Sequence, residues 1–504
     1  MIRFTSSEIL HLTMINSLKN TTAKHYLFVL CLISLANNAF TQSLRWSLTS
    51  ASSDISSSPR FTDLNKDGVL DVVLGAGIEN VPSKNGVIAL NGKTGEMLWA
   101  HPSPTQIYTS ALFQDVNGDG IDDVFIGGRS ATFLAIDGAT GKSIWEFWTG
   151  TKENARKASV LNFFATQWVA DQNKDGFKDL LCTNGGDYLA GPKDKNRVVA
   201  KLMVISGKDG KALASAKLPE QRESYYAPHT YTNHKNQTMI LFGTGGETID
   251  GGLWEVPLEH LMKNSIAKAK LIAHDSIKGF ILNSVLVDLN NDGNLDILNA
   301  RMSATLSAFD GKTHAKIWEV SEFIGYECYV TPTLGQFTGD ATLDFFTIIA
   351  KGSFPAYSEF MLVVVDGKTG KVAYTEKAGF NQYSPASAVD LNNDGMDEII
   401  YIENTLLDPE QFLVVNQVKV IDFKNKSNYY VGPIRKGLSM ASTPSIVDLD
   451  NDGAYELIVA TSSIAPEKAQ PYSIIECIDL NNRNLKINWS GYLGKYGTGI
   501  YSAE

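Results

Sequence analysis

The chain has 504 residues, of which 43% are hydrophobic and 20% are charged, and its formal net charge is −11. This composition is typical of a well-folded soluble protein. The acidic balance argues against nucleic acid as a partner, because proteins that bind nucleic acid present basic surfaces to the phosphates.

Residues 1–41 are predicted to form a secretory signal peptide. Lys24 precedes an apolar run at residues 26–36, and small and polar residues follow up to Gln42. The run is too short to span a bilayer comfortably, and no other segment is long and apolar enough. We therefore expect a protein without a transmembrane segment after cleavage, secreted, extracellular or on the cell surface, with the periplasm as the alternative location.

Three cysteines follow the predicted signal peptide, at Cys182, Cys328 and Cys477. They are widely separated and odd in number, and two of them end apolar, strand-like runs. This pattern favours buried reduced thiols over a disulfide framework.

Six short acidic loops of the form D-x-[DN]-x-D-G-x-x-[DE] begin at residue 63 and recur along the chain. They occupy residues 63–71, 115–123, 171–179, 288–296, 390–398 and 448–456. Oxygen-bearing side chains at positions 1, 3, 5 and 9 can converge on one hard cation, and glycine at position 6 permits the sharp turn that this requires. Calcium fits best, because it accepts six to eight oxygen ligands in a tolerant geometry. Position 12 falls in an apolar run instead of being a glutamate, which excludes an EF-hand.

The spacing of the loops indicates a repeat. Two gaps are about twice as long as the others, and each contains a degenerate copy, near residue 230 and at residues 336–344. In each unit, strands flank the loop, and an Asp/Asn-Gly hairpin such as residues 137–145 joins a third strand to a fourth. The result is an all-β fold: one propeller domain over residues 42–504, with eight blades of four antiparallel strands, or seven as the alternative. An aromatic residue on the fourth strand is expected to fill the gap between blades.

Three segments depart from the repeat. Residues 257–270 in the fourth unit are predicted to form an inserted helix with proline in its first turn. Residues 44–48 resemble a fourth strand, although residues 485–491 already supply one for the last unit. Residues 499–504 resemble the start of a further first strand. Either terminal segment can pair across the seam of the ring, and a chain truncated relative to its relatives is the other interpretation.

The acidic loops, each followed by a V-V-L-G-like strand, resemble FG-GAP/VCBS repeats, the units of integrin-α-type propellers. The D-G-K-T-G-x-x-x-W hairpins resemble the repeats of quinoprotein-like (PQQ-like) propellers and of an outer-membrane assembly lipoprotein with the same fold. The first resemblance implies about six structural Ca²⁺, each held by side chains at loop positions 1, 3, 5 and 9 and by the carbonyl at position 7. The implied side-chain ligands are Asp63, Asn65, Asp67 and Asp71; Asp115, Asn117, Asp119 and Asp123; Asp171, Asn173, Asp175 and Asp179; Asp288, Asn290, Asp292 and Asp296; Asp390, Asn392, Asp394 and Glu398; and Asp448, Asp450, Asp452 and Glu456.

These resemblances favour a calcium-stabilised binding, adhesion or scaffold module whose ligand is an unidentified protein or glycan. An extracellular polysaccharide lyase is the alternative, but the six histidines after the signal peptide show no catalytic grouping. A PQQ-dependent dehydrogenase is the third interpretation, and the chain lacks the adjacent cysteine pair typical of that family. No catalytic motif is present, which favours a non-enzymatic role and leaves the question of catalysis open.

An aromatic residue stands seven positions before the loop in four units. These residues are Tyr108, Phe164, Tyr329 and Tyr383, and three other units have Ser56, Ile281 and Ala441 at this place. Packing between blades is the simpler interpretation. The alternative is a ligand platform at the mouth of the channel, on the face opposite the calcium loops, because aromatic rings offer large contact areas at low entropic cost.

Overall fold

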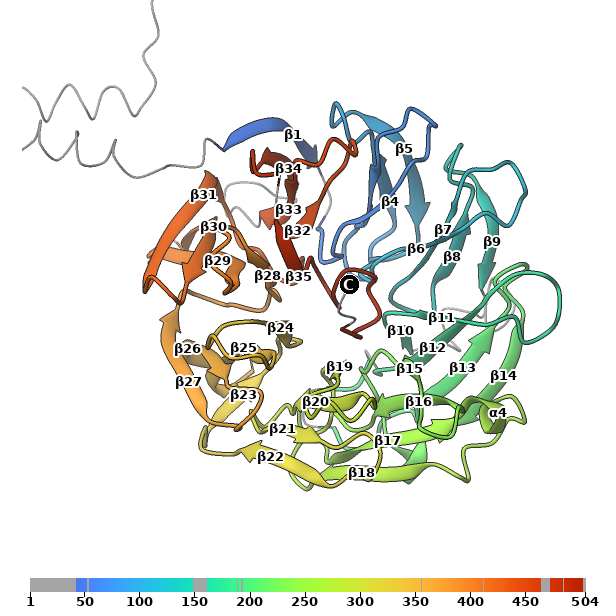
Figure 1. Ribbon diagram of the computed structural model, residues 1–504. Helices are drawn as coiled ribbons and strands as arrows, with labels where there is room; N and C mark the ends of the chain where they lie inside the picture. Colours follow the sequence, from blue (N-terminus) through green and yellow to red (C-terminus); the bar gives the residue numbers. More distant parts are fainter. Residues whose placement is uncertain are drawn as a thin grey trace, which may run out of the picture. The chain divides into compact units, whose positions relative to one another are not determined.

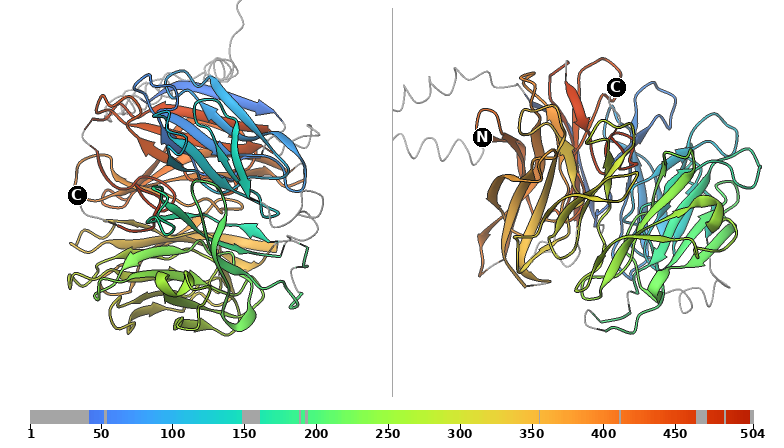
Figure 2. Two further views of the ribbon diagram at one scale, coloured as in Figure 1. Left: turned by 90° about the vertical axis from the view of Figure 1, so that its right-hand side faces the viewer. Right: turned by 60° about the horizontal axis from the view of Figure 1, so that its bottom comes forward.

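The computed structural model describes residues 42–51, 54–147, 161–187, 189–191, 194–354, 356–410, 412–463, 472–483 and 485–501. Within the compact unit Gln42–Glu504, the strands form eight antiparallel sheets arranged as blades around an axis (Figure 1). Figure 2 shows these blades from two further directions. The prediction of an eight-bladed propeller is confirmed, and the seven-bladed alternative is wrong. The predicted signal peptide at residues 1–41 lies outside the described residues.

The first four blades follow the chain. Blade 1 has β2 (Arg60–Thr62), β3 (Asp71–Gly75), β4 (Ser83–Leu90) and β5 (Met97–Ser103). Blade 2 has β6 (Leu112–Gln114), β7 (Asp123–Gly127), β8 (Phe133–Ile136) and β9 (Ser143–Phe147). Blade 3 has β10 (Asn162–Phe163) and β11 (Gln167–Val169), which both pair with β12 (Asp179–Gly185), then β13 (Lys201–Ile205) and β14 (Ala212–Lys217). Blade 4 has β15 (His229–Thr232), β16 (Thr238–Gly243), β17 (Gly251–Pro257) and β18 (Lys270–Asp275).

The other four blades complete the ring. Blade 5 has β19 (Val285–Val287), β20 (Asp296–Ala300), β21 (Leu306–Phe309) and β22 (Lys316–Val320). Blade 6 has β23 (Tyr326–Cys328) and β24 (Thr333–Gly335), which both pair with β25 (Asp344–Ser353), then β26 (Ala356–Val365) and β27 (Val372–Ala378). Blade 7 has β28 (Ser387–Asp390), β29 (Glu398–Asp408), β30 (Leu413–Asp422), β31 (Ser427–Lys436) and β35 (Lys486–Trp489). Blade 8 has β32 (Ser445–Val447), β33 (Glu456–Ser463), β34 (Tyr472–Asp479) and β1 (Ser43–Ala51).

The predicted helix at residues 257–270 is much shorter than expected. Only α4 (Leu258–Leu261) is helical, and it joins the third and fourth strands of blade 4. Asn264 adopts a positive φ of 56°, which ends any helical continuation. A single 3₁₀ turn, η1 (Pro219–Gln221), precedes this blade. Across the described part of the chain, no helix has the length and apolar character that a membrane span requires.

The hydrophobic core lies between adjacent blades, because each sheet has two apolar faces. One cluster, for example, packs Val72 and Leu74 of blade 1 against Ile458 and Ile475 of blade 8. The fourth-strand tryptophans join neighbouring blades, since the indole of each donates a hydrogen bond of 2.7–3.0 Å to a hairpin glycine carbonyl in the next blade: Trp46 to Gly92, Trp99 to Gly138, Trp145 to Gly207 and Trp318 to Gly367. The expectation that these aromatics fill the gap between blades is confirmed. Cys182, Cys328 and Cys477 are buried free thiols, as predicted.

The ring closes through its two ends. β1 is the outer strand of blade 8 and pairs antiparallel with β34 over Ser43–Ala51 and Tyr472–Asp479. Arg45 on this strand contacts three carboxylates of the same blade, with Nε 2.6 Å from Asp479 and Nη2 2.7 Å from Glu456. Residues near the start of the described chain thus complete a blade built from its last third.

The prediction that residues 485–491 form the fourth strand of the last unit is wrong. β35 instead pairs with β28 at the axial edge of blade 7, where Ala388 lies opposite Trp489. The position at the outer edge of blade 8 is taken by β1, whose Trp46 fills the interblade gap. Residues 499–501 do not begin a new blade, because Ile500 makes only an isolated parallel bridge to Leu286.

Deleting residues 43–51 should destabilise the protein strongly, because it removes Trp46 from the seam and leaves one edge of β34 unpaired. Loss of a buried tryptophan alone costs about 3–5 kcal/mol. The check is chemical denaturation of the full-length and shortened proteins. Adding the peptide 43–51 in trans should restore part of the stability. An unchanged unfolding midpoint would contradict the role of β1 as the closing strand.

Candidate functional site

All six acidic loops join the first strand of a blade to the second and therefore lie on one face of the ring. The glycine at position 6 is in the left-handed region in each loop, with φ between 79° and 95°. A residue with a side chain is strained in this conformation, which explains why glycine occupies the position. The sequence pattern therefore marks a specific backbone turn.

The carboxylate at position 1 organises each loop from within. Asp63 accepts hydrogen bonds from the backbone nitrogens of Asp67, at 3.2 Å, and Gly68, at 3.0 Å. Asp288 and Asp448 accept the corresponding bonds in blades 5 and 8. The side chain at position 1 thus fixes the turn by accepting bonds from the backbone at positions 5 and 6.

The carboxylate at position 9 is buried in all six loops, and in blades 1, 2, 3 and 5 it ties the loop to the hairpin between strands three and four. Asp71 accepts bonds from the nitrogen of Leu64, at 2.9 Å, and from the nitrogen of Gly92, at 3.0 Å. Burial, reinforced by Asp67 and Asp63, raises the pKa of Asp71 to about 6. Burial likewise raises the pKa of Glu398 to about 8 and that of Glu456 to about 7. A cation at these loops would offset the cost of keeping the carboxylates ionised.

The degenerate loop in blade 6 shows that the carboxylate at position 9 can bond the backbone of its blade in a loop that lacks other predicted metal ligands. Asp344 accepts bonds from the nitrogens of Phe337, at 2.8 Å, and Gly367, at 3.1 Å, as in the complete loops. Positions 1 and 3 are Gln336 and Thr338, so this loop lacks the aspartate at position 1 and the aspartate or asparagine at position 3 that the complete loops have. The ninth carboxylate is therefore part of the blade framework, whether or not its loop has a full ligand set.

In blades 7 and 8, acidic side chains already converge. The carboxylate oxygens of Asp394, Glu398 and Asp422 lie within 4.8 Å of one another, and so do those of Asp448, Asp450 and Glu456. Asp422 was missed from the sequence because it lies at the end of β30, outside the nine-residue loop motif, and is not followed by glycine. The available signal was the aspartate that begins the hairpin in other blades. In blade 2, for example, Asn117 of the loop donates a hydrogen bond of 3.3 Å to Asp137 of the hairpin.

In the blade 8 loop, an arginine lies among the predicted ligands. The Arg45 guanidinium lies 3.2 Å from Asp450 and 2.7 Å from Glu456, so it neutralises part of the predicted ligand set. Asp450 nevertheless keeps its second oxygen, Oδ1, buried and without a hydrogen-bond partner in the described chain. The oxygen donors and the free lone pairs fit a hard cation such as calcium.

On the opposite face, a cavity of about 530 Å³ lies at the mouth of the central channel. We call it the axial well. Its rim is formed by the residue seven positions before the loop in each of the eight blades: Ser56, Tyr108, Phe164, Tyr225, Ile281, Tyr329, Tyr383 and Ala441. All four aromatics singled out from the sequence therefore line one cavity. They also make contacts between blades, since Tyr383 of blade 7 packs against Tyr329 and Phe360 of blade 6. Tyr225 was missed because the degenerate loop of blade 4 has no acidic motif from which its position could be counted.

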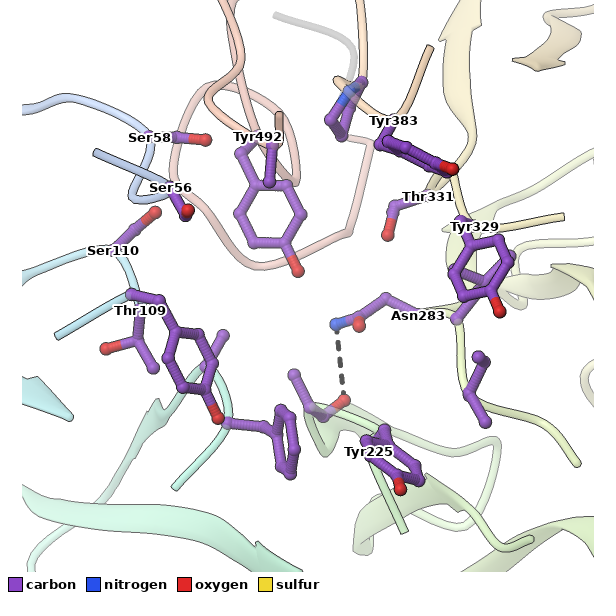
Figure 3. A pocket seen from close by; sticks show the side chains of 18 of the residues that line it. Ser56, Ser58, Thr109, Ser110, Tyr225, Asn283, Tyr329, Thr331, Tyr383 and Tyr492 are labelled. Atoms are coloured by element: carbon purple, nitrogen blue, oxygen red, sulfur yellow. Dashed lines mark hydrogen bonds between the residues drawn. The ribbon is translucent and has the colours of Figure 1, made fainter. Parts of the chain in front are cut away.

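The aromatic residues form two groups across the axial well. Tyr108, Phe164 and Tyr225 form a continuous arc, with successive ring centroids 5.7 and 5.5 Å apart. Tyr329 and Tyr383 form the second group, with centroids 5.8 Å apart and rings nearly perpendicular. Figure 3 shows Tyr225, Tyr329 and Tyr383 around the cavity and Ser56, Ser58 and Ser110 on its other side.

Charged groups of both signs also line the axial well. Arg129 lies 5.5 Å from the centre of the Tyr108 ring and is held by Glu79 at 3.2 Å. Glu247, on the loop between β16 and β17, has a pKa raised by burial, while the neighbouring Tyr329 hydroxyl partly offsets this effect. The lining therefore offers aromatic faces, hydroxyl groups, one guanidinium and one carboxylate.

The histidines are structural where their contacts are described. His101 bonds to the carbonyl of Gly141 at 2.8 Å, and His314 lies 3.4 Å from Glu255. His229 lies beneath the axial well, with Nδ1 2.8 Å from the carbonyl of Thr498 and Nε2 3.2 Å from Asn283 Nδ2. This geometry makes Nδ1–H the donor and Nε2 the acceptor, so His229 orients Asn283, which lines the axial well.

The sequence profile of the FAM234A/B β-propeller matches residues 110–394, more than half of the chain. The chain belongs to this family. Human protein FAM234B is 23% identical over 349 residues, which cover 63% of this chain and 51% of that protein. The chain thus spans about half the length of its FAM234 relative.

Two solved structures share the propeller fold. Quinohemoprotein alcohol dehydrogenase from Comamonas testosteroni is 11% identical, covers 89% of this chain and 78% of its own, and has a TM-score of 0.52. Quinohemoprotein alcohol dehydrogenase ADHIIG from Pseudomonas putida HK5 is 10% identical, covers 87% of this chain and 76% of its own, and has a TM-score of 0.54. At this level of identity, the likeness concerns the fold alone. It agrees with the quinoprotein-like form of the repeats in this FAM234-family propeller.

His229 should make the stability of the protein sensitive to acid. Burial lowers its pKa to about 4, whereas an unfolded histidine has a pKa of about 6.5. Between these values the unfolded chain takes up a proton that the folded protein does not, so stability present above pH 6.5 is lost as the pH falls toward 4. Relative to His229→Gln, the wild type should lose about 2 kcal/mol more between pH 7 and pH 5. The measurement is urea unfolding at each pH, and parallel losses in the two proteins would rule the effect out.

Proposed function

We propose that this FAM234-family propeller is a binding module that holds a ligand in the axial well. The observation that carries the proposal is the ring of equivalent residues, one per blade, of which five are aromatic. Aromatic side chains provide a large contact surface, and they lose little conformational entropy when a ligand binds. The volume of the cavity, about 530 Å³, lies within the range typical of small-molecule sites. Adhesion or scaffold roles are forms of this same function, with a protein or a glycan as the ligand.

We also propose that the six acidic loops bind calcium in the manner of FG-GAP/VCBS repeats and that the metal is structural. This is supported by the turn shared by the loops, by the buried carboxylates at position 9, and by the converging acidic groups of blades 7 and 8. The chemistry fits a secreted or surface-exposed protein, or a periplasmic one, where residues 1–41 serve as the export signal. Calcium would link each loop to its hairpin and stiffen the face opposite the axial well.

Rim variants test the binding site. Tyr108→Ala and Tyr383→Ala should each weaken capture of ligand by about 10-fold or more, as expected for buried aromatic anchors, while the melting temperature changes little. The measurement is binding to a panel of immobilised glycans and extracellular protein domains. Tyr430→Ala is the matched control, because this tyrosine is half exposed on the outer strand of blade 7. If both rim variants melt several degrees lower and bind normally, the aromatics are packing residues and the site lies elsewhere.

Chelation tests the calcium sites. Each site at a free calcium concentration of 100 times its Kd adds about 2.7 kcal/mol to stability. Removing calcium should therefore lower the melting temperature by more than about 10 °C, and elemental analysis should find about five to seven ions per chain.

A pair of single substitutions gives the matched control. Asp119→Ala changes position 5 of a complete loop and should remove one calcium ion per chain. Asp340→Ala changes position 5 of the degenerate loop in blade 6 and should leave the calcium content unchanged. Finding one ion or none in the wild type would overturn the assignment of the loops.

A further inference from the structure

The axial well has a bottom, formed by residues 490–501, which we call the floor segment. It leaves β35 and crosses the channel, where Figure 1 shows the dark red ribbon of the last described residues near the centre of the ring. Its backbone carbonyls accept hydrogen bonds from five blades: Ser490 from Ile446, Tyr492 from Arg60, Gly497 from Gln167, Thr498 from His229 and Gly499 from Leu286, at 2.7–2.9 Å. The backbone nitrogen of Tyr501 returns a bond to Leu286, at 2.8 Å.

The floor segment is packed tightly against the first strands. Gly497 has a φ of 68°, and a Cβ at this position would lie 2.4 Å from the Arg60 guanidinium. Leu493 is buried, with 2% of its surface exposed. Glycine is therefore needed at Gly497 for the segment to approach the wall of the channel. These contacts make the floor segment a fixed part of the propeller axis.

The position of the floor segment along the strands defines the depth of the axial well. The rim residues stand seven positions before each loop, whereas the partners of the floor segment, such as Gln167 and His229, stand two to four positions before it. Three to five residues of chain therefore separate the rim from the floor contacts in the blades that the floor segment touches. A ligand that enters between the rim aromatics meets Tyr492 and the floor segment instead of an open channel (Figure 3).

The lining chemistry is that of a polyhydroxylated ligand. Rim aromatics provide flat apolar faces, and beneath them Ser58, Ser110, Asn283 and Thr331 provide hydroxyl and amide groups. Both a carboxylate and a guanidinium face the cavity, so neither sign of ligand charge is favoured outright. A sugar ring presents an apolar face together with several hydroxyl groups that donate and accept, and it satisfies this combination.

We infer that the axial well recognises the terminal residue of a glycan chain, and that the floor segment excludes the passage of internal residues. This inference rests on the proposed function, namely that the axial well is a binding site. The rim aromatics stack on the terminal sugar, the hydroxyl and amide groups beneath them bond its hydroxyls, and Tyr492 closes the end of the cavity. The rest of the glycan leaves through the rim.

An array of defined linear glycans, each coupled to the surface through its reducing end, tests the inference. The glycans that bind are measured again after an exoglycosidase removes the terminal residue and after internal repeats are added. We expect removal of the terminal residue to weaken binding by at least about 10-fold and additional internal repeats to leave it unchanged. Affinity that grows with the number of internal repeats and survives removal of the end would overturn the inference. So would capture of protein domains together with a negative array.

Variants of the floor segment provide the second arm. Tyr492→Ala should weaken capture of glycan ends by about 10-fold, and Tyr492→Phe, which keeps the ring, should weaken it less. Tyr496→Ala is the matched control, because this tyrosine lies on the same segment with 64% of its surface exposed, and it should bind like the wild type. Equal binding by all three variants would remove Tyr492 from the site and overturn its role.

The two arms separate this inference from the proposed function. If Tyr108→Ala and Tyr383→Ala abolish capture but removal of the terminal sugar does not, the axial well binds a ligand and only the chain-end inference fails. If capture survives both rim substitutions, the proposed site itself fails.

Discussion

Closure of the ring is the constraint on which the rest of this structure depends. Each blade is a sheet with two apolar faces. Both faces are buried only if the blade has a neighbour on each side, which requires a closed ring. The last seam is sealed by Val72 and Leu74 from one side and Ile458 and Ile475 from the other. β1 completes it by pairing with β34 and inserting Trp46 against Gly92 of blade 1. Without this strand, the edge of blade 8 and its apolar contacts would face water.

A closed ring of eight blades also creates an axis that its first strands do not fill. Here the floor segment occupies the channel and satisfies polar groups on five of those strands. The space that remains is the axial well, bounded by equivalent positions of all eight blades. Repetition thus converts a single position in the sequence unit into a complete ring around a cavity. The variation among these positions, from Ser56 and Ala441 to the five aromatics, gives the cavity its two aromatic groups and its polar side.

The two faces of the propeller follow from the direction of the strands. Buried carboxylates at loop position 9 tie the loops of blades 1, 2, 3 and 5 to a hairpin on one face, and this arrangement persists at Asp344 in the degenerate blade 6. Burial of these groups raises their pKa values, so the loops carry an electrostatic cost that a bound cation would lower. In blade 8, Arg45 already supplies a positive charge. The proposed calcium ions would therefore bind to loops whose shape is already set by backbone hydrogen bonds.

The sequence alone determined the repeat, the number of blades, the place of the acidic loops between first and second strands, and four of the five rim aromatics. These properties are local or periodic, because turn chemistry and alternating apolar strands act within one unit of about 50–60 residues. Only the tertiary structure decided that residues 43–51 close the ring, that residues 486–489 join blade 7, and that residues 490–501 cross the axis. Pairing between segments more than 400 residues apart leaves no periodic signal in the sequence. The contact of Arg45 with the blade 8 loop could not be predicted for the same reason. Tyr225 could not be predicted because its repeat is degenerate and offers no motif from which to count its position.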